Sequence, residues 1–204
     1  MSQKNMWLIE EQYYGRGIRL VCGVDEAGRG PLAGPVCAAA VILPEHVEIP
    51  GLDDSKKLSD KRRRELFPLI KENAIAYGIA FSDHREIDEI NILQASLLAM
   101  ERAIRMLDPV PEVVLIDGNR AKDFGIPAET VVHGDSLSAS IAAASILAKV
   151  TRDDYMVRMA EEYPQYSFEV HKGYGTKVHY AALEEFGPCP IHRNTFLKKY
   201  YGQK

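Results

Sequence analysis

The segment from Val21 to Gly34, VCGVDEAGRGPLAG, places two adjacent carboxylates, Asp25 and Glu26, at the end of an apolar run. Such a run is typical of a buried strand, and burial of an unpaired carboxylate charge is unfavourable. Two glycines follow within four residues, and a second apolar run covers residues 35–44. The short link between the runs predicts an antiparallel pair of strands, with both acids at the junction.

Apolar periodicity along the chain predicts a mixed α/β fold. The strand candidates are residues 17–25, 35–44, 74–83, 111–118 and 128–135. Helical spacing of apolar side chains marks residues 86–107 and 136–163, and a shorter helix is expected at 177–187. We therefore expect a mixed five-stranded sheet flanked by helices, in a single domain over 1–204 with a core at about 1–163 and a small C-terminal helical annex at about 164–204.

Length and composition exclude several classes of protein. A chain of 204 residues, 46% of them hydrophobic, can bury one core of ordinary size. No window has the roughly 18 consecutive apolar residues of a membrane span, and the N-terminus lacks a secretory signal. Cys22, Cys37 and Cys189 form no CxxC pair, which argues against a disulfide framework and a zinc site. We expect a cytoplasmic monomer with no membrane partner.

Three acidic residues lie at the ends of predicted strands: Asp25, Asp117 and Asp135. Ligands gather at strand ends in open α/β sheets, so these side chains are expected to lie close together. Carboxylates in one small space repel each other at pH 7, and a divalent cation removes the repulsion. A donor set of oxygens alone suits Mg²⁺ or Mn²⁺. Structural explanations stay open: Asp135 can cap the next helix, and Asp117-Gly118 can be a turn.

Five segments resemble the ribonuclease HII family. They are GVDEAGRGPLAGPVCAAAVIL, LDDSKKLSDKRR, LIDGN, GDSLSASIAAASILAKVTRD and YPQYSFEVHKGYGTKVHYAALEEFGPCPIHRNTF, in order from about residue 20 to residue 196. Ribonuclease HIII shares the fold, but its first acidic motif lacks the GRG sequence. It also typically carries an extra N-terminal domain, which the residues ahead of GVDE are too few to supply.

The resemblance implies a ribonuclease H-like fold and a metal-dependent endoribonuclease. Its substrates would be RNA–DNA hybrids and duplex DNA with a single embedded ribonucleotide, incised on the 5′ side. In the family, four carboxylates bind the catalytic metal ions, and the matching residues are Asp25, Glu26, Asp117 and Asp135. Two ions, Mg²⁺ or Mn²⁺, would activate the attacking water and stabilise the leaving 3′ oxygen, which leaves 5′-phosphate and 3′-hydroxyl ends. Successive strand residues point to opposite faces, so Glu26 is expected to reach the metal because the chain is already turning there.

The resemblance also implies contacts that recognise the ribonucleotide. Gly28, Arg29 and Gly30 match a loop whose main chain reads the 2′-hydroxyl, and a Cβ would block that approach. A plain hairpin link is the alternative for this loop. Tyr174 matches a tyrosine that stacks on the deoxyribose beside the scissile ribonucleotide, and packing of its loop on the domain is the alternative. His133 stands where many relatives have Lys.

Basic residues cluster in residues 55–64, SKKLSDKRRR, with a local net charge of +5 in a chain of net charge −4. Such runs are usually solvated helix faces, but beside an acidic metal site this one could follow the phosphates of a nucleic acid. By resemblance, Lys56 and Lys57 are the expected substrate contacts. Helical spacing also predicts a polar edge that faces the substrate, formed by Ser145, Lys149 and Arg152.

Two other functions stay open at this point. A ribonuclease HIII-like enzyme, or another nuclease of the ribonuclease H fold, would share the acids without depending on the GRG loop. A non-catalytic nucleic-acid-binding module would keep the basic run and would not need Asp25 or Asp117. The segment after Phe196 shows no motif for binding a replication clamp.

Overall fold

The computed structural model of the protein describes residues 5–202 and is built on a five-stranded sheet. The strands are β1 (Val21–Ala27), β2 (Val36–Ile42), β3 (Ala76–Ser82), β4 (Val113–Asp117) and β5 (Ala128–Val131). They lie in the order β3-β2-β1-β4-β5, with antiparallel pairs among the first three strands and parallel pairs from β1 to β4 and from β4 to β5. The predicted mixed five-stranded sheet is confirmed. Residues 1–4 and 203–204, at the two ends of the predicted 1–204 domain, lie outside the described residues, so the last two positions of the segment after Phe196 are not described.

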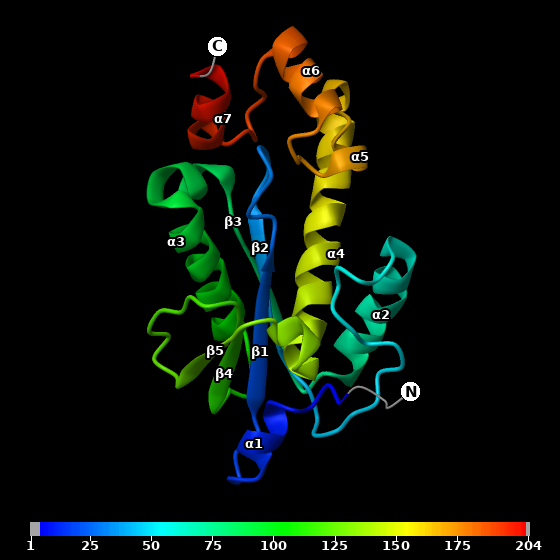
Figure 1. The fold of residues 1–204 in the computed structure, drawn as a ribbon, viewed down its shortest axis with the longest axis vertical. Helices are drawn as coiled ribbons and strands as arrows, with labels where there is room; N and C mark the ends of the chain where they lie inside the picture. Colours follow the sequence, from blue (N-terminus) through cyan, green and yellow to red (C-terminus); the bar gives the residue numbers. More distant parts are fainter. Residues whose placement is uncertain (1–4, 203–204) are drawn as a thin grey trace.

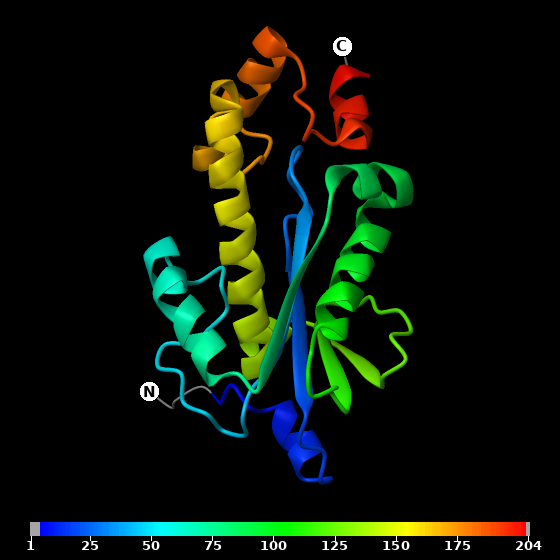
Figure 2. The same ribbon diagram turned by 180° about the vertical axis from the view of Figure 1, so that it is seen from behind.

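Helices cover both faces of the sheet (Figures 1 and 2). They are α1 (Glu10–Tyr14), α2 (Asp60–Asn73), α3 (His84–Arg105), α4 (Ala139–Glu162), α5 (Phe168–His171), α6 (Lys177–Phe186) and α7 (Asn194–Tyr201), with short 3₁₀ turns η1 (Gly134–Ser136) and η2 (Pro164–Tyr166). On β2, Ala38 and Ala40 pack in the core on the α3 side, whereas Ala39 and Val41 pack in the core on the α4 side. None of the helices among the described residues is long and apolar enough to cross a bilayer.

Small residues let α4 approach the sheet closely. Ala142, Ala143 and Ala144 are fully buried. The opposing position on β1 is Gly23, where an added Cβ would lie 2.1 Å from the main-chain carbon of Ser140. A larger residue at this position would push α4 away from the strand that carries Asp25.

The long amphipathic helix predicted at 86–107 is α3, but it is interrupted near its beginning. Asn91 has φ of 68°, and its side-chain oxygen accepts hydrogen bonds from the main-chain N–H groups of Leu93 and Gln94. Asn91 therefore acts as an N-cap for the longer second part of α3. The periodicity of apolar residues continues across the interruption, so the pattern alone does not reveal it.

The segment between β5 and α4 differs from the prediction. The predicted strand at 128–135 ends at Val131, and His133 turns the chain with a left-handed φ of 58°. Asp135 then lies in η1, and the helix begins only at Ala139, with Ser138 as its N-cap accepting from the N–H of Ile141 at 3.1 Å. The interpretation of Asp135 as a helix cap is therefore wrong, because Ser138 already has that role.

After α4, the helices α5 and α6 lie beside its C-terminal end, whereas α7 lies at the beginning of α3 (Figures 1 and 2). They share a hydrophobic cluster in which Tyr166, Phe168 and Leu183 pack on Met156 of α4 and on Leu32 of the loop after β1. This cluster attaches the C-terminal segment to the same end of the sheet at which Asp25 and Asp117 lie. The division into a core and an annex stays a prediction.

Candidate active site

Parallel pairing of β1 and β4 places two acids side by side. Val24 lies opposite Ile116 in the register, and each is followed directly by an acid, Asp25 on β1 and Asp117 on β4. The N–H of Gly134 donates to Asp117 Oδ1 at 2.8 Å and thereby holds the η1 turn against the end of β4. Asp135, the next residue, is buried at the same edge of the sheet. Asp25 therefore lies near the end of β1 and Asp117 at the end of the adjacent β4, with Asp135 beyond the end of β5 in η1.

Glu26 reaches this edge in a different way from the one predicted. β1 runs on to Ala27, which still pairs with Cys37, so the chain has not turned at Glu26. Glu26 pairs with Ala38, whose side chain faces α3, whereas Asp25 pairs with Ala39, whose side chain faces α4. Since paired residues share a face, the two acids leave the strand on opposite sides of the sheet edge. The expectation of an early turn is wrong.

Burial and mutual repulsion disfavour negative charge on these acids. Burial, and then the charges of Glu26 and Asp117, raise the pKa of Asp25 well above its usual range. Burial likewise raises the pKa of Glu26, although the guanidinium of Arg29 opposes this shift. Burial and then the charge of Asp135 raise the pKa of Asp117. The cluster therefore stabilises a bound proton or a nearby cation.

Lys56 supplies one such cation. Its ammonium lies 3.0 Å from Asp135 Oδ2. Burial works against the charge on Lys56, but the bond to Asp135 and the fields of Asp25 and Asp117 outweigh burial and raise the pKa of Lys56. The lysine precedes α2, so a segment distant from the acids in sequence brings positive charge to them.

The donor chemistry of the cluster fits a hard divalent cation, because every side chain of the acidic set offers oxygen. Within residues 5–202, no group of three or more His, Cys, Asp or Glu side chains is arranged as a ligand set around one point. The acids are thus gathered at one edge without forming a closed coordination sphere. Their assignment as metal ligands rests on this chemistry and on the raised pKa values of Asp25, Glu26 and Asp117.

One cavity of about 280 Å³ collects most of the residues predicted for the site. Its lining is Asp25, Glu26, Ala27, Gly28, Arg29, Gly30, Ser55, Lys56, Arg63, Asp117, Ser145, Lys149 and Tyr174. Asp135 and Lys57 are absent from its wall, and Asp135 connects to the cavity through Lys56. Larger cavities of about 650 and 700 Å³ lie elsewhere and contain none of the predicted site residues.

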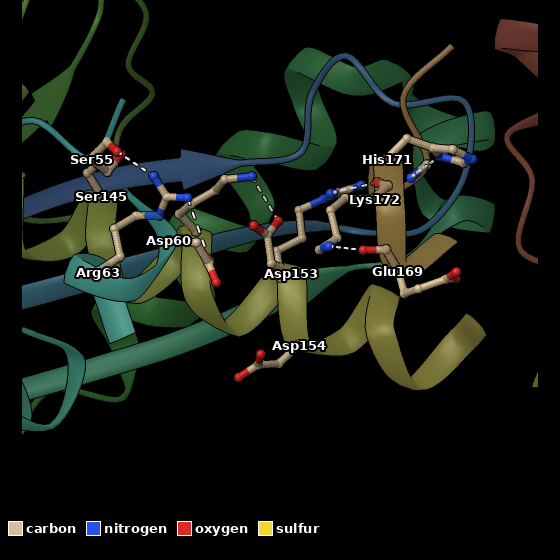
Figure 3. Close-up of polar contacts among 12 residues, drawn as sticks. Ser55, Asp60, Arg63, Ser145, Asp153, Asp154, Glu169, His171 and Lys172 are labelled. Carbon is tan, nitrogen blue, oxygen red and sulfur yellow. Dashed lines mark hydrogen bonds and ion pairs between the residues drawn. The ribbon is translucent and has the colours of Figure 1, made fainter. Parts of the chain in front are cut away.

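Ser55 and Arg63 line this cavity but were not predicted as site residues. Ser55 Oγ and Ser145 Oγ of α4 lie 2.5 Å apart, and Arg63 of α2 donates to the Ser55 carbonyl at 2.8 Å (Figure 3). These contacts attach the segment that carries Lys56 to α4. Serines and an arginine beside a basic run give no distinctive sequence signal, so pattern alone would not have identified this pair.

The polar edge predicted on α4 is only partly present. Ser145 hydrogen-bonds Asp25 as well as Ser55, and Lys149 donates to Asp153 at 2.8 Å, so both are at the cavity. Arg152 is buried and donates to the main-chain carbonyls of residues 33, 35 and 172. Its expected position facing the substrate is therefore wrong, because the guanidinium stabilises buried carbonyls.

The GRG loop is held from behind by a second buried guanidinium. Arg193 donates to the carbonyls of Gly28 at 2.6 Å, Arg29 at 2.9 Å and Gly34 at 2.9 Å. These three bonds fix the main chain of the loop while leaving its other side at the cavity. Arg193 lies 164 positions after Arg29, and only the fold reveals that they meet.

Most of the basic run at 55–64 is paired with nearby acids. Arg62 bonds Glu65 at 2.9 Å, and Arg64 bonds Asp60 at 2.8 Å and Asp154 at 2.7 Å. Lys57 lies 3.4 Å from Ser136 Oγ, at the border of η1. Of the basic side chains in this run, only Lys56 and Arg63 line the cavity. The charge available for phosphates is therefore smaller than the composition of the run suggests.

Tyr174 lines the same cavity from the loop between α5 and α6. Its side chain is 44% exposed, so it is not a core residue. The Cζ of Arg152 lies 6.0 Å from the centre of its ring. The loop therefore packs on the domain while the ring of Tyr174 stays exposed. His133 is exposed, on the turn before η1.

The sequence resembles known proteins over nearly its whole length. The family model described as Ribonuclease HII matches residues 22–201. Ribonuclease HII of Acetivibrio thermocellus is 52% identical over 195 residues, which cover 96% of this chain and 76% of the relative. Ribonuclease HII of Endomicrobium trichonymphae is 55% identical over 193 residues, which cover 94% of this chain and 92% of the relative.

Solved structures share the fold. The ribonuclease H2 of Pyrococcus horikoshii superposes with a TM-score of 0.72 at 24% identity, over 90% of this chain and 99% of the other. The ribonuclease HII of Archaeoglobus fulgidus, solved as a complex with PCNA, superposes with a TM-score of 0.71 at 23% identity, over 86% and 93%. With a family model that spans residues 22–201 and relatives identical at more than half of the positions, the chain belongs to the ribonuclease HII family, metal-dependent endoribonucleases that act on RNA–DNA hybrids.

Proposed function

We propose that this ribonuclease HII also incises duplex DNA on the 5′ side of a single embedded ribonucleotide, and that it leaves 5′-phosphate and 3′-hydroxyl ends. One observation carries the proposal. The cavity that contains Asp25, Glu26 and Asp117 is also lined by the GRG loop and by Tyr174. Groups suited to hydrolysis and groups suited to reading one sugar thus share a single small space.

Asp25, Glu26, Asp117 and Asp135 would hold two divalent ions, Mg²⁺ or Mn²⁺. When bound, such ions supply an activated water and stabilise the leaving 3′ oxygen. The protein's own part is to hold the acids ready. The N–H of Gly134 fixes Asp117, the hydroxyl of Ser145 bonds Asp25, and Lys56 retains Asp135 at the sheet edge.

Recognition of the ribonucleotide falls to the GRG loop and Tyr174, which line the same cavity. The 2′-hydroxyl both donates and accepts, so main-chain groups at Gly28, Arg29 and Gly30 suit it if no side chain intervenes. The half-exposed ring of Tyr174 offers an apolar face to the neighbouring deoxyribose. Together these groups would distinguish a lone ribonucleotide followed by DNA from an all-DNA strand.

The phosphates of the substrate would meet a small basic border. Lys56 and Lys149 line the cavity, and Lys57 lies next to it at Ser136. Such contacts add affinity without sequence preference. The acids themselves repel phosphates, so these lysines offset that repulsion at the entrance. We also propose that the enzyme acts as a monomer in the cytoplasm, and sedimentation of the free protein tests the first of these statements.

A cleavage assay tests the proposed function. Purified protein with Mg²⁺ or Mn²⁺ is mixed with a labelled duplex that contains one ribonucleotide, with an all-DNA duplex of the same sequence as the control. We expect one nick on the 5′ side of the ribonucleotide, loss of the nick with EDTA, and no cleavage of the control. Cleavage of hybrids together with an untouched embedded ribonucleotide would contradict the proposal.

A further inference from the structure

Three histidines are buried beneath the loop that carries Tyr174. His171, His179 and His192 have exposed fractions of 8%, 0% and 1%. The rings of His171 and His179 stack with centroids 4.6 Å apart and planes 14° apart. Figure 3 shows His171 at the end of α5, next to Lys172. These three histidines belong neither to the acidic cluster nor to the lysines at the border of the cavity.

Hydrogen bonds fix which nitrogen of each ring carries a proton. The N–H of Cys189 donates to His192 Nδ1 at 2.9 Å, so this nitrogen offers a lone pair. His192 Nε2 lies 2.9 Å from His179 Nε2, and His179 Nδ1 lies 2.9 Å from the carbonyl oxygen of Tyr174. A carbonyl only accepts, so His179 Nδ1 is the protonated nitrogen of its ring.

These assignments make a directional chain. His192 donates through Nε2 to the lone pair of His179 Nε2, and His179 donates through Nδ1 to Tyr174. The carbonyl of Cys189 also approaches His192 Nδ1, but at the longer distance of 3.2 Å. A proton added to either ring would turn one acceptor of the chain into a donor that faces another donor. Both rings are therefore neutral when the chain is intact.

His171, whose ring stacks on His179, supports the same loop at a second point. The N–H of Gly173 donates to His171 Nδ1 at 3.2 Å, and His171 Nε2 lies 2.8 Å from the carbonyl of Tyr166. The imidazoles thus satisfy the main-chain N–H before Tyr174 and the main-chain carbonyl of Tyr174 itself. These bonds hold both main-chain groups of this short turn, and thereby fix the backbone position from which the tyrosine ring reaches Gly30.

We propose that His192 and His179 are positioning residues, which act through the carbonyl of Tyr174 to hold its ring beside Gly30 and thereby set the preference for a lone ribonucleotide. This inference rests on the proposed role of Tyr174. The charge state that it requires is supported by burial, which lowers the pKa of both His179 and His192 to about 4. At neutral pH the chain of donors and acceptors is therefore complete.

Nitrogen-15 NMR tests the chain of donors directly. Two-bond correlations between the ring protons and nitrogens at pH 7 report the tautomer of each imidazole. We expect the Nδ1–H tautomer for His179 and the Nε2–H tautomer for His192. An Nε2–H tautomer for His179, or a charged ring at either position, would overturn the inference without any reference to activity.

Variants of His192 test the effect of this hydrogen-bond chain on substrate preference. His192→Asn keeps an acceptor near Cys189 but removes the donor to His179, whereas His192→Gln restores an amide donor near the position of Nε2. The readout is the ratio of kcat/KM for a lone ribonucleotide to kcat/KM for a continuous RNA strand. We expect the ratio to fall roughly tenfold or more in His192→Asn, as for loss of other supporting hydrogen bonds around a site. His192→Gln should recover most of it, and an exposed control, His46→Asn, should not change it.

The ratio is insensitive to partial unfolding, because an inactive fraction lowers both rates alike. An unchanged ratio in His192→Asn, beside a lowered ratio in Tyr174→Ala, overturns this inference and leaves the proposed function intact. If Tyr174→Ala itself leaves the ratio unchanged, the proposed role of Tyr174 fails, and the inference about selectivity falls with it.

Discussion

The ring of Tyr174 lies against Gly30, where an added Cβ would be 3.4 Å from the tyrosine Cε1. The other glycine of the loop is confined in a different way. Gly28 has φ of +98°, and a Cβ there would lie 1.9 Å from Nε of the buried Arg152. Gly28 is thus required by the packing of the protein itself, whereas Gly30 borders the cavity with space for one more carbon.

Alanine at Gly28 should therefore lower the stability of the fold, whereas alanine at Gly30 should lower activity. Gly28→Ala should lower Tm by several degrees, because the left-handed backbone alone costs about 1–2 kcal/mol. Gly30→Ala should keep the wild-type Tm but lower cleavage at an embedded ribonucleotide by about a hundredfold, since the added methyl group displaces the sugar. Thermal unfolding and kcat/KM of both variants decide the matter. Normal cleavage by Gly30→Ala would show that its main chain is not close to the substrate.

Removing one charge from the acidic cluster should abolish cleavage and stabilise the fold. Burial, and then repulsion from Glu26 and Asp117, raise the pKa of Asp25, and Asp25→Asn removes the buried charge. Asp117→Asn keeps an oxygen for the N–H of Gly134. Relief of about 1 kcal/mol would raise Tm by about 2–4 °C in a chain of this size. The exposed Glu48→Gln makes the same change of charge and should alter neither property. Cleavage by Asp25→Asn within about tenfold of wild type would contradict two-metal catalysis at this cluster.

Lys56 should affect metal binding and substrate binding in opposite directions. Lys56→Met removes an ammonium 3.0 Å from Asp135, so the cluster should bind Mn²⁺ about fivefold more tightly. The same change should weaken duplex binding and lower the slope of log K against log[salt] by about one. Isothermal titration with Mn²⁺ and duplex binding at several salt concentrations measure the two effects. Lys61→Met, at an exposed lysine of α2, is the matched control for Mn²⁺ affinity.

Sequence patterns predicted that Asp25 and Asp117 lie on adjacent strands, because strand registry brings them together without any long side-chain contact. They failed where a role depends on partners distant in sequence. Asp135 precedes a helix in the sequence, but Ser138 caps it. Arg152 has helical spacing with Ser145 and Lys149, yet its guanidinium turns inward to three carbonyls. Capping and burial depend on tertiary contacts, which spacing along one helix does not encode.

The buried histidines predict how stability depends on pH. The pKa of His179 and of His192 is lowered to about 4 by burial, whereas the unfolded chain takes up these protons below about pH 6.5. Their contribution to stability is therefore present above pH 6.5 and is lost as pH falls toward 4, by up to about 1.4 kcal/mol per pH unit for each ring. The titratable groups that face them are His171 and His84, with lowered pKa values, and Cys189, with a raised one.

A comparison of two proteins isolates this effect. The acidic cluster has the opposite sign, because its raised pKa values make its contribution grow as pH falls. That term is common to wild type and to His192→Gln, so it cancels in the difference between them. Urea unfolding from pH 4.5 to 7.5 should show that the variant loses less stability than wild type on acidification. Parallel curves would contradict a neutral, buried His192.

Tyr174 allows the recognition of the sugar to be separated from packing. If the ring stacks on a deoxyribose, its face contributes most and its hydroxyl little, so Tyr174→Phe should retain most activity on a lone ribonucleotide. Tyr174→Ala should lose about 1–3 kcal/mol of stacking, or roughly 5- to 150-fold in kcat/KM. Because the side chain is 44% exposed, neither change should lower Tm much.

The two substrates give the decisive comparison for Tyr174. Stacking at a junction predicts a larger loss on a single ribonucleotide than on a continuous RNA strand, and little loss of duplex binding, which the phosphates dominate. A packing role predicts instead that Tyr174→Ala lowers Tm and depresses both substrates alike. Equal losses with a lower Tm would leave the GRG loop, held by Arg193 and bordered by Gly30, as the remaining reader of the ribonucleotide.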